Sequence, residues 1–446
     1  MILLRNIEID GSTRDVLIQK GVIARIAPSG SSLAWDLAGD VEIMDCSGKV
    51  AVPGFINMHT HAGMSLMRGV GEDMVFHDWL RSIWAIEDKF DADFVYWSTK
   101  VACLEMIRTG TTTFNDQYWF FPEAHRAATE LGVRHALGYD IIDRNDPVET
   151  EREKEQCARW YEEKAAAVRD SGNIYQLAFH AIYSVSEPMI CWASEFARDK
   201  GMNLHIHLCE TRKEVEDCKA AHGGLTPVEY LDELGVLGPN LLAAHTLWLS
   251  EHDIELLAAR GVHCIHNINS NAKLSSGYRF LYNEMRDAGI NICIGTDGCA
   301  SSNNMDILEA MKTAALFQKA WRDDPKSLPL DELIAMATTN GAKALKINAG
   351  KLEEGALADI LIVDTDNSFF LSPAPFLANF IYSAHSDCID SVICNGKFVM
   401  RHREIEGEKD ILSEARKQIT RMLLHHGRKS SKNQPRSEIF QVLHRT

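Results

Sequence analysis

Apolar and polar residues alternate in short runs through residues 1–51, and none of these runs has the length or the 3.6-residue period of a helix. Gly and Asp/Ser turns separate the runs, which is typical of a β-rich segment. We expect this segment to form the N-terminal part of a small β-sandwich domain, with strands at Ile2–Leu4, Asp15–Gln19, Val22–Ala27 and Glu42–Asp45.

From residue 52 to residue 348, apolar strand-like runs take turns with longer amphipathic segments. Eight strands alternating with helices predict an α/β fold with a parallel (β/α)8 TIM-like barrel rather than an open sheet. The predicted strands are Phe55–Met58, Thr111–Asn115, Ala136–Ile142, Tyr175–His180, Asn203–Leu208, Leu241–His245, His263–His266 and Ile290–Thr296. The predicted helices are Phe94–Arg108, Val148–Arg169, Pro188–Lys200, Thr226–Leu234, Asp253–Ala259 and Met305–Trp321, the last with Asn303 and Asn304 as N-caps.

Short apolar strands return in residues 349–405, at Ile360–Asp364 and Ser391–Cys394. Asn395-Gly396 is a strong hairpin signal and leads into a further strand, Lys397–Met400. We expect this segment to be the C-terminal part of the β-sandwich, paired with the N-terminal part beside the barrel. Residues 406–446 are expected to form a C-terminal helix or tail with a basic end, to which we assign no role.

Composition excludes several classes of partner. The net charge of −17 argues against nucleic acid, because phosphate binding requires a positive surface. No apolar run approaches the ~20 residues of a membrane-spanning helix, and the N-terminus lacks the pattern of a signal peptide. The 11 cysteines are scattered without a Cys-x-x-Cys pair, which is typical of a reducing compartment. The composition therefore predicts a cytoplasmic protein and leaves open whether it forms a homo-oligomer.

Ionisable residues stand where the predicted barrel strands end, which is where barrel enzymes carry their chemistry. His59-Thr60-His61 ends the first strand, and side chains two residues apart share one face of a strand. Another strand ends in His207, followed three residues later by Glu210. Later strands deliver His245 and Asp297 in the same way.

Each of these signals is weak alone. A lone His-x-His is more often structural than metal-binding, His205 reads as a core histidine, and Asp297 by itself could be a helix cap. Together, three or more imidazoles and two carboxylates in one barrel mouth would cost several kcal/mol for each unpaired charge. A bound cation removes that cost, and three histidines with one aspartate suit zinc or iron.

Seven stretches, in this order along the chain, resemble the amidohydrolase superfamily, and within it the branch of 5′-methylthioadenosine/S-adenosylhomocysteine deaminases and chlorohydrolases. They run from about residue 45 to about residue 400 and read PGFINMHTHAGMSLMRG, WLRSIWAIE, HLCET, AAHTLWLS, HNINSNAKLSSG, GTDGCASSNNMDILEAMKTAAL and KLEEGALADILIVD. The resemblance implies a hydrolase that acts on C–N bonds of cyclic amidines.

The resemblance also implies roles for the polar residues at the strand ends. The catalytic candidates are Glu210 as proton shuttle, His245 as the group that steadies the attacking water or the oxyanion, and Asp297 as the acceptor of the water's proton. The metal ligands it implies are His59, His61, His207 and Asp297. No lysine stands where related binuclear enzymes carry a bridging one, so we expect a single divalent metal ion, zinc in the first place with Fe²⁺ or Mn²⁺ as alternatives. Zinc lowers the pKa of water to ~7, which makes hydroxide available for attack on the ring.

The substrate implied is a small purine-like molecule, of the adenosine, 5′-methylthioadenosine or S-adenosylhomocysteine type. Glu87 resembles a carboxylate that holds ribose hydroxyls, His180 a substrate-contacting histidine and Arg144 a substrate-side arginine. Trp84 either walls an apolar pocket over the ring or packs its segment onto the barrel. The alternatives are an aminohydrolase or chlorohydrolase of a free pterin, guanine-like or triazine ring, and a noncatalytic metal-binding protein.

Overall fold

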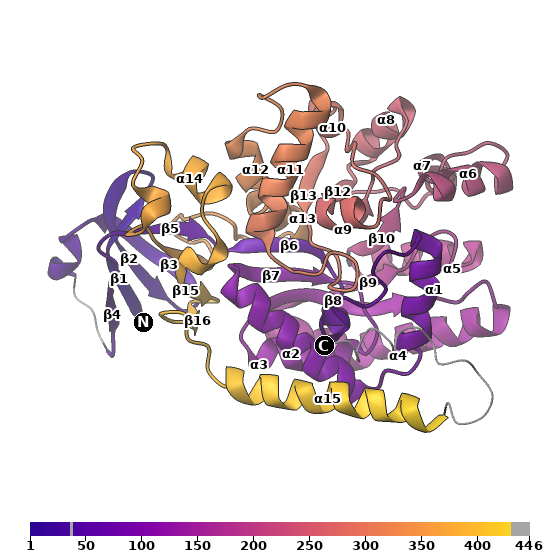
Figure 1. Cartoon of the computed structure of the whole chain (residues 1–446), viewed down its shortest axis with the longest axis horizontal. Coiled ribbons are helices and arrows are strands. Elements are labelled where there is room, and N and C mark those ends of the chain that lie inside the picture. The colour runs from indigo at the N-terminus through magenta and orange to yellow at the C-terminus, as the bar shows by residue number, and fades with distance from the viewer. Residues whose placement is uncertain (36–38, 430–446) are drawn as a thin grey trace.

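The computed structural model describes residues 1–35 and 39–429, and its central unit is a barrel of eight parallel strands (Figure 1). Each strand from β6 to β13 pairs in parallel with the next along the chain. The predicted barrel is therefore confirmed. Its strands are β6 (Phe55–Thr60), β7 (Thr111–Asp116), β8 (Arg134–Ile141), β9 (Ile174–Phe179), β10 (Leu204–Leu208), β11 (Leu241–His245), β12 (His263–His266) and β13 (Asn291–Ile294).

The barrel closes between its first and last strands, beside two of the candidate ligands. The backbone N–H of Asp297, just after β13, donates to the carbonyl of His59 in β6 at 2.9 Å, and Thr60 and Asp297 form a parallel bridge. A Cβ at Gly295 would lie 2.8 Å from the backbone nitrogen of His59, so the approach of the two strands requires glycine there. Closure thus brings polar residues more than two hundred positions apart next to each other.

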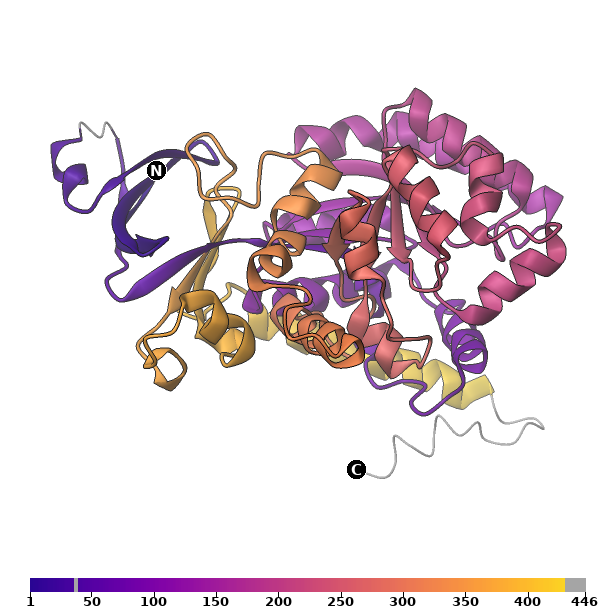
Figure 2. The ribbon, with the colours of Figure 1, turned by 90° about the horizontal axis from the view of Figure 1, so that it is seen from above.

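Helices lie between the strands and cover the outside of the barrel (Figure 2). A 3₁₀ turn, η2 (Ala62–Met67), and helix α1 (Phe76–Glu87) follow β6. The others are α2 (Ala92–Arg108), α3 (Phe121–Glu130), α4 (Pro147–Asp170), α5 (Glu187–Asp199), α6 (Arg212–Ala221), α7 (Pro227–Glu233), α8 (Glu251–Arg260), α9 (Ile268–Lys273), α10 (Tyr282–Asp287), α11 (Ile307–Arg322), α12 (Leu330–Met336) and α13 (Thr339–Leu345).

Asn303 and Asn304, the N-caps that we expected for helix α11, are wrong. Asp306 caps α11, because its carboxylate accepts hydrogen bonds from the backbone N–H groups of Leu308 and Glu309. The side-chain amide of Asn304 instead donates to the carboxylate of Glu309, and that of Asn303 bonds outside the helix. Asp and Asn are about equally good caps, so sequence alone did not separate neighbouring candidates.

The two chain ends form one mixed sheet of eight strands, which curls beside the barrel (Figure 2). Some of its apolar residues pack into a core of their own, whereas Val52, Leu361 and Val392 are among those that pack into the barrel core. The strands are β1 (Ile2–Ile9), β2 (Ser12–Gln19), β3 (Val22–Pro28), β4 (Glu42–Asp45), β5 (Lys49–Pro53), β14 (Ile360–Asp364), β15 (Ile389–Cys394) and β16 (Lys397–Met400). A short helix, α14 (Phe376–Tyr382), lies between β14 and β15.

The sheet and the barrel are joined by an almost continuous strand. β5 pairs with β14 in the sheet, and only Gly54 separates it from β6 of the barrel. A Cβ at Gly54 would lie 2.3 Å from Oγ1 of Thr112, so no larger residue fits at the junction. β5 therefore runs across the boundary between residues 51 and 52 that we placed between the two expected domains.

A buried ion pair ties the same two units together. Arg134 in β8 pairs with Asp359, which directly precedes β14, and it also donates to the side-chain carbonyl of Asn395. The side chains of Arg134 and Asp359 are 1% and 2% exposed. Removal of one partner would leave the other charge buried and unpaired, so we expect this pair to matter for stability.

Helix α15 (Glu408–Lys429) runs along α2 on the outside of the barrel (Figure 1). Ion pairs fasten it, between Arg108 and Glu408 and between Arg421 and Asp91. The end of the predicted basic tail, residues 430–446, lies outside the described residues. Within the described chain, no helix combines the length and the apolar character that a bilayer crossing requires. All 11 cysteines lie in that part of the chain and are free thiols.

Candidate metal centre and substrate cavity

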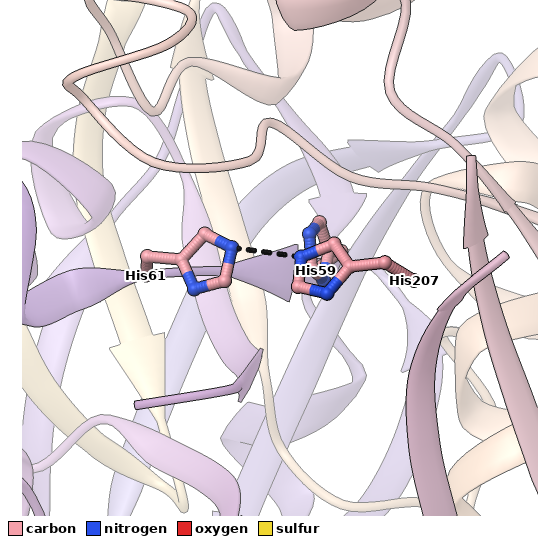
Figure 3. Close-up of side chains that lie close together, drawn as sticks. All are labelled: His59, His61 and His207. Atoms are coloured by element: carbon pink, nitrogen blue, oxygen red, sulfur yellow. Dashed lines mark hydrogen bonds between the residues drawn. The ribbon is translucent and has the colours of Figure 1, made fainter. Parts of the chain in front are cut away.

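Five polar side chains meet at the carboxyl ends of the barrel strands. His59 lies in β6 and His61 follows it, His207 lies in β10, His245 ends β11 and Asp297 follows β13. All five are buried. The imidazole rings of His61 and His207 face each other, with His59 beside them (Figure 3). The structure thus brings together all four of the ligands that we predicted, together with His245.

The atoms of these side chains converge on one point. Nε2 of His61 lies 3.2 Å from Nε2 of His207 and 3.2 Å from Oδ1 of Asp297. Nε2 of His59 lies 3.5 Å from the same oxygen. Two groups have donor atoms within 4.8 Å of one another, as a metal site requires: His59, His61 and His207, and His59, His245 and Asp297. Because both groups contain His59, they describe a single place in the barrel mouth.

The orientation of the imidazoles fits a cation. Nδ1 of His61 donates to the carbonyl of Gln117 at 2.6 Å, and Nδ1 of His207 donates to the carbonyl of His180 at 2.8 Å. A neutral imidazole that donates from Nδ1 has a lone pair on Nε2. Two lone pairs would then face each other at 3.2 Å, an arrangement that requires a proton or a metal ion between them. Without a cation, burial lowers the pKa of His61, but the hydrogen bond and charge of Asp297 outweigh it and raise the pKa to about 9.

His205, which we read as a core histidine, supports the third imidazole. Its Nε2 lies 3.0 Å from Nδ1 of His59, and both rings are fully buried. The Nε2 atom of His59 has no hydrogen-bond partner and points to the converging ligands. A hydrogen bond at the second ring nitrogen is the usual support of a metal-binding histidine. The signal that reveals His205 is a second His-x-His, with His207, on β10.

Glu210 and His245 lie beside the convergence point. Glu210 is buried, and this burial, followed by the nearby charge of Asp297, raises the pKa of its carboxyl group well above the ordinary value. Nδ1 of His245 accepts a hydrogen bond from the amide nitrogen of Asn271 at 3.0 Å, and burial lowers the pKa of His245 to about 3. His245 is therefore neutral with its hydrogen on Nε2, which makes it a donor rather than a ligand.

Backbone strain is concentrated at these strand ends. Cys209, His245, Thr246 and Asp297 all have left-handed φ values, of 53°, 74°, 44° and 63°. Residues other than glycine adopt this conformation at a cost, and such residues gather at functional sites. Here the turns follow β10, β11 and β13, and they direct polar side chains inward instead of continuing the strand.

A cavity opens from the convergence point toward α1. Its wall includes Trp79, Trp84 and His180, and the ring of Trp84 meets that of His180 edge-on with centroids 5.6 Å apart. Trp84 and His180, both predicted as substrate contacts, thus line the same cavity. Glu87, at the end of α1, also lines it and accepts a hydrogen bond from the hydroxyl of Tyr118 at 2.6 Å. Burial is the main cause that raises the pKa of Glu87 to about 7.

Arg144 is not brought to this cavity. It is exposed, pairs with Asp88 at 3.3 Å, and lines a second, larger cavity of about 720 Å³. The two cavities share Glu87, Tyr118 and Asp140, so the second lies directly beyond the first. The sequence analysis missed Tyr118 and Asp140, although both lie at or just after the end of a barrel strand, where polar residues gather.

A TIM-type barrel that carries three imidazoles and a carboxylate at its strand ends, next to a second buried acid, defines a metal-dependent hydrolase. The chain belongs to the amidohydrolase family, whose model matches residues 50–399.

The chain is similar over most of its length to two named deaminases and to one solved structure. The chain is 45% identical over 382 residues to the 5′-deoxyadenosine deaminase of Methanoregula boonei, an alignment that covers 84% of this chain and 85% of that protein. It is 39% identical over 420 residues to the 5-methylthioadenosine/S-adenosylhomocysteine deaminase 1 of Archaeoglobus fulgidus, which covers 92% and 96%. A crystal structure of an adenosine deaminase from Xanthomonas campestris with bound zinc superimposes with a TM-score of 0.85 at 29% identity, over 95% of this chain and 98% of that one.

Proposed function

We propose that this enzyme deaminates adenosine-type nucleosides, converting the nucleoside and one water molecule into the inosine analogue and ammonia by hydrolysis at the 6-amino group of the purine. The observation that carries the proposal is the convergence of His59, His61, His207 and Asp297 beside the buried Glu210, in a cavity that also contains Glu87. The similar proteins are named as deaminases of 5′-deoxyadenosine or of 5-methylthioadenosine and S-adenosylhomocysteine. These names support the same substrate class.

The metal ligands are Nε2 of each of the three histidines and the carboxylate of Asp297, and the metal is zinc. The facing lone pairs and the unpartnered Nε2 of His59 support a cation at this point, and the nitrogen and oxygen donors suit zinc. The zinc bound to the similar adenosine deaminase supports the choice of metal. A zinc ion held by these residues would lower the pKa of a water molecule to ~7 and so would supply the nucleophile at neutral pH.

The protein supplies the proton transfers and orients the ring. Asp297 accepts the proton that the water gives up, while Glu210, protonated because it is buried, donates to the ring nitrogen next to the reacting carbon. The new C–O bond forms as the ring nitrogen takes the proton of Glu210, and the Nε2–H of His245 donates to the oxygen of the new hydroxyl group. The amino group then takes the proton that Asp297 accepted, the C–N bond breaks with release of ammonia, and the hydroxyl proton returns to Glu210 as the C=O bond forms.

The nucleoside is held farther out in the cavity. Trp84 and His180 contact the purine or the ribose, and the carboxylate of Glu87 accepts hydrogen bonds from the ribose hydroxyls. The second cavity begins at Glu87 and leaves room for a substituent on the 5′ carbon. Its volume of about 720 Å³ is large enough for a homocysteine substituent and also accepts a nucleoside that has only a hydrogen atom there.

Substitution at the strand ends tests the proposal. We expect Glu210→Gln to retain metal at the wild-type level and to lose ~10²–10⁴ in kcat, since general acid–base catalysis contributes that much. His207→Ala should lose both metal and activity. The measurements are elemental analysis of the purified proteins and the loss of the adenine absorbance band with adenosine, 5′-deoxyadenosine, 5′-methylthioadenosine and S-adenosylhomocysteine. Full activity of Glu210→Gln, or no turnover of any of these nucleosides by the wild-type enzyme, would refute the proposal.

A further inference from the structure

The turn that carries Glu210 is held by a second glutamate. One carboxylate oxygen of Glu214 accepts a hydrogen bond from the backbone N–H of Cys209 at 2.8 Å, and the other accepts from the N–H of Glu210 at 2.8 Å. Glu214 is 5% exposed and lies in the first turn of α6. A buried carboxylate thus accepts hydrogen bonds from the backbone N–H groups of two consecutive residues, the second of which is the proposed proton shuttle.

The turn requires such a partner. Cys209 has a φ of 53°, a conformation that a residue with a side chain adopts at a cost and keeps only where its surroundings enforce it. The N–H groups of Cys209 and Glu210 lie between the end of β10 and the start of α6, where no strand or helix pairs them. Their two hydrogen bonds to Glu214 satisfy both donors and hold the strained turn.

A second Thr-x-x-Glu sequence in the same protein shows that this arrangement goes beyond helix capping. At the start of α7, Thr226 and Glu229 form an ordinary capping box, in which Glu229 accepts from the backbone N–H of Thr226 at 2.7 Å. At the start of α6, Thr211 caps the helix in the same way, accepting from the N–H of Glu214 at 3.1 Å. Glu214, however, reaches past Thr211 to the two residues before it.

We propose that Glu214 is a positioning residue for catalysis, which fixes the backbone of Glu210 so that its carboxyl group faces the reacting ring. This inference rests on the proposed function, because it assigns Glu214 a role only through Glu210. Glu214 is not among the residues that line the cavity. A displacement of a catalytic group by about 1 Å can lower the rate ~10²-fold, which is the scale of effect that loss of the clamp should have.

Two substitutions at residue 214 and one matched control test the proposal. In Glu214→Gln, one oxygen still accepts a hydrogen bond, but the amide NH₂ faces the other backbone donor; Glu214→Ala removes both hydrogen bonds. We expect kcat for 5′-deoxyadenosine to fall ~10–10²-fold in Glu214→Gln and further in Glu214→Ala, with KM within ~3-fold of wild type and metal content unchanged. Hydrogen exchange at the amides of Cys209 and Glu210, followed by mass spectrometry, should become faster in both variants. The control, Glu229→Gln, changes the equivalent capping glutamate of α7 and should leave kcat within ~2-fold of wild type.

Several results would overturn the inference while the proposed function stands. These are wild-type kcat in Glu214→Gln with full metal content, an equal fall of kcat in Glu229→Gln, or a loss of metal from the Glu214 variants, which would mean that Glu214 acts through His207. Failure of the proposed function looks different, because the wild-type enzyme itself would then release no ammonia from any adenosine analogue. Melting temperatures, measured for all four proteins, identify a variant that is unfolded; if Glu214→Ala is unfolded, the comparison of Glu214→Gln with Glu229→Gln decides.

Discussion

Glu87 is a buried carboxyl group that titrates near neutral pH, as does Asp140 in the same cavity. The hydroxyl of Tyr118 donates a hydrogen bond to Glu87, and burial raises the pKa of Glu87 to about 7. A carboxylate accepts stronger hydrogen bonds than a protonated carboxyl group. Because the pKa is raised, the strong acceptor is present above about pH 7 and is lost as the pH falls below it.

We therefore expect KM for adenosine-type nucleosides to rise as the pH falls through about 7, by ~5–10-fold, the difference between a charged and a neutral hydrogen bond. In Glu87→Gln the higher KM should be nearly independent of pH, because the amide does not titrate. KM measured across this pH range for both proteins checks the prediction, with a 2′,3′-dideoxy nucleoside as the matched substrate that lacks the hydroxyls. Unchanged deamination by Glu87→Ala would instead favour a free ring as the substrate, which needs no grip on a ribose.

Among single residues, the candidate ligands were accessible from sequence and their supports were not. His59 and His61 share one face of a strand by their spacing, and Glu210 follows His207 by three positions. His205 stands on the same strand face as His207, yet it contacts His59 and not the convergence point. Spacing along a strand gives the face of a side chain, but its partner across the barrel depends on the neighbouring strands.

At the level of strands and helices, function depends on the turns that follow the strands and on the contacts between elements. The barrel strands were predicted to within a few residues because buried parallel strands are continuous apolar runs, whereas β5 was not predicted and β1 extends beyond the predicted Ile2–Leu4. The left-handed turns after β10, β11 and β13 carry no equivalent signal, since the residues that take the left-handed conformation there are not the glycine that usually does. The ion pair between Arg134 and Asp359 is such a contact, between residues 225 positions apart.

Asp359→Asn should lower the free energy of unfolding by ~3–5 kcal/mol, because it leaves the guanidinium of Arg134 buried without its counter-charge. Denaturant or thermal unfolding measures the loss. The matched control is Asp232→Asn, which breaks the pair with Arg260 in which the arginine side chain is 53% exposed, and it should cost at most ~1 kcal/mol. Equal losses in the two variants would contradict a special role for the buried pair.

In the molecule as a whole, the proposed metal ligands join distant parts of the barrel. His59 lies in its first strand and His61 directly after it, His207 lies in the fifth strand, and Asp297 follows the last. A cation held by all four therefore cross-links the mouth of the barrel, in addition to the hydrogen bond between Asp297 and His59. Metal binding at this point should therefore also stabilise the folded barrel.

Chelation should therefore lower the melting temperature, and added zinc should restore it. A ligand present at 100 times its dissociation constant stabilises the folded state by ~2.7 kcal/mol, which is readily detected. Calorimetry of the purified, chelated and reloaded enzyme measures the effect, and magnesium, which prefers six oxygen ligands, serves as the control ion. A melting temperature that does not respond to zinc would contradict the proposed centre.

Periodicity and chain order were enough to predict the barrel and the set of polar residues at the strand ends, because the strands and helices of the barrel depend on neighbours along the chain. The pairing of the two β-rich ends was expected from their similar strand rhythm on either side of the barrel. The contacts of those residues depended on how the barrel closes. Closure placed Asp297 against His59, made His205 a support for an imidazole, and left Arg144 outside the inner cavity. Glu214 shows the same division, since its Thr-x-x-Glu sequence predicts a helix cap, whereas its grip on Cys209 and Glu210 arises only where β10 turns into α6. Local interactions determine which segments become strands or helices, but side chains from distant elements meet only after the backbone has closed around them.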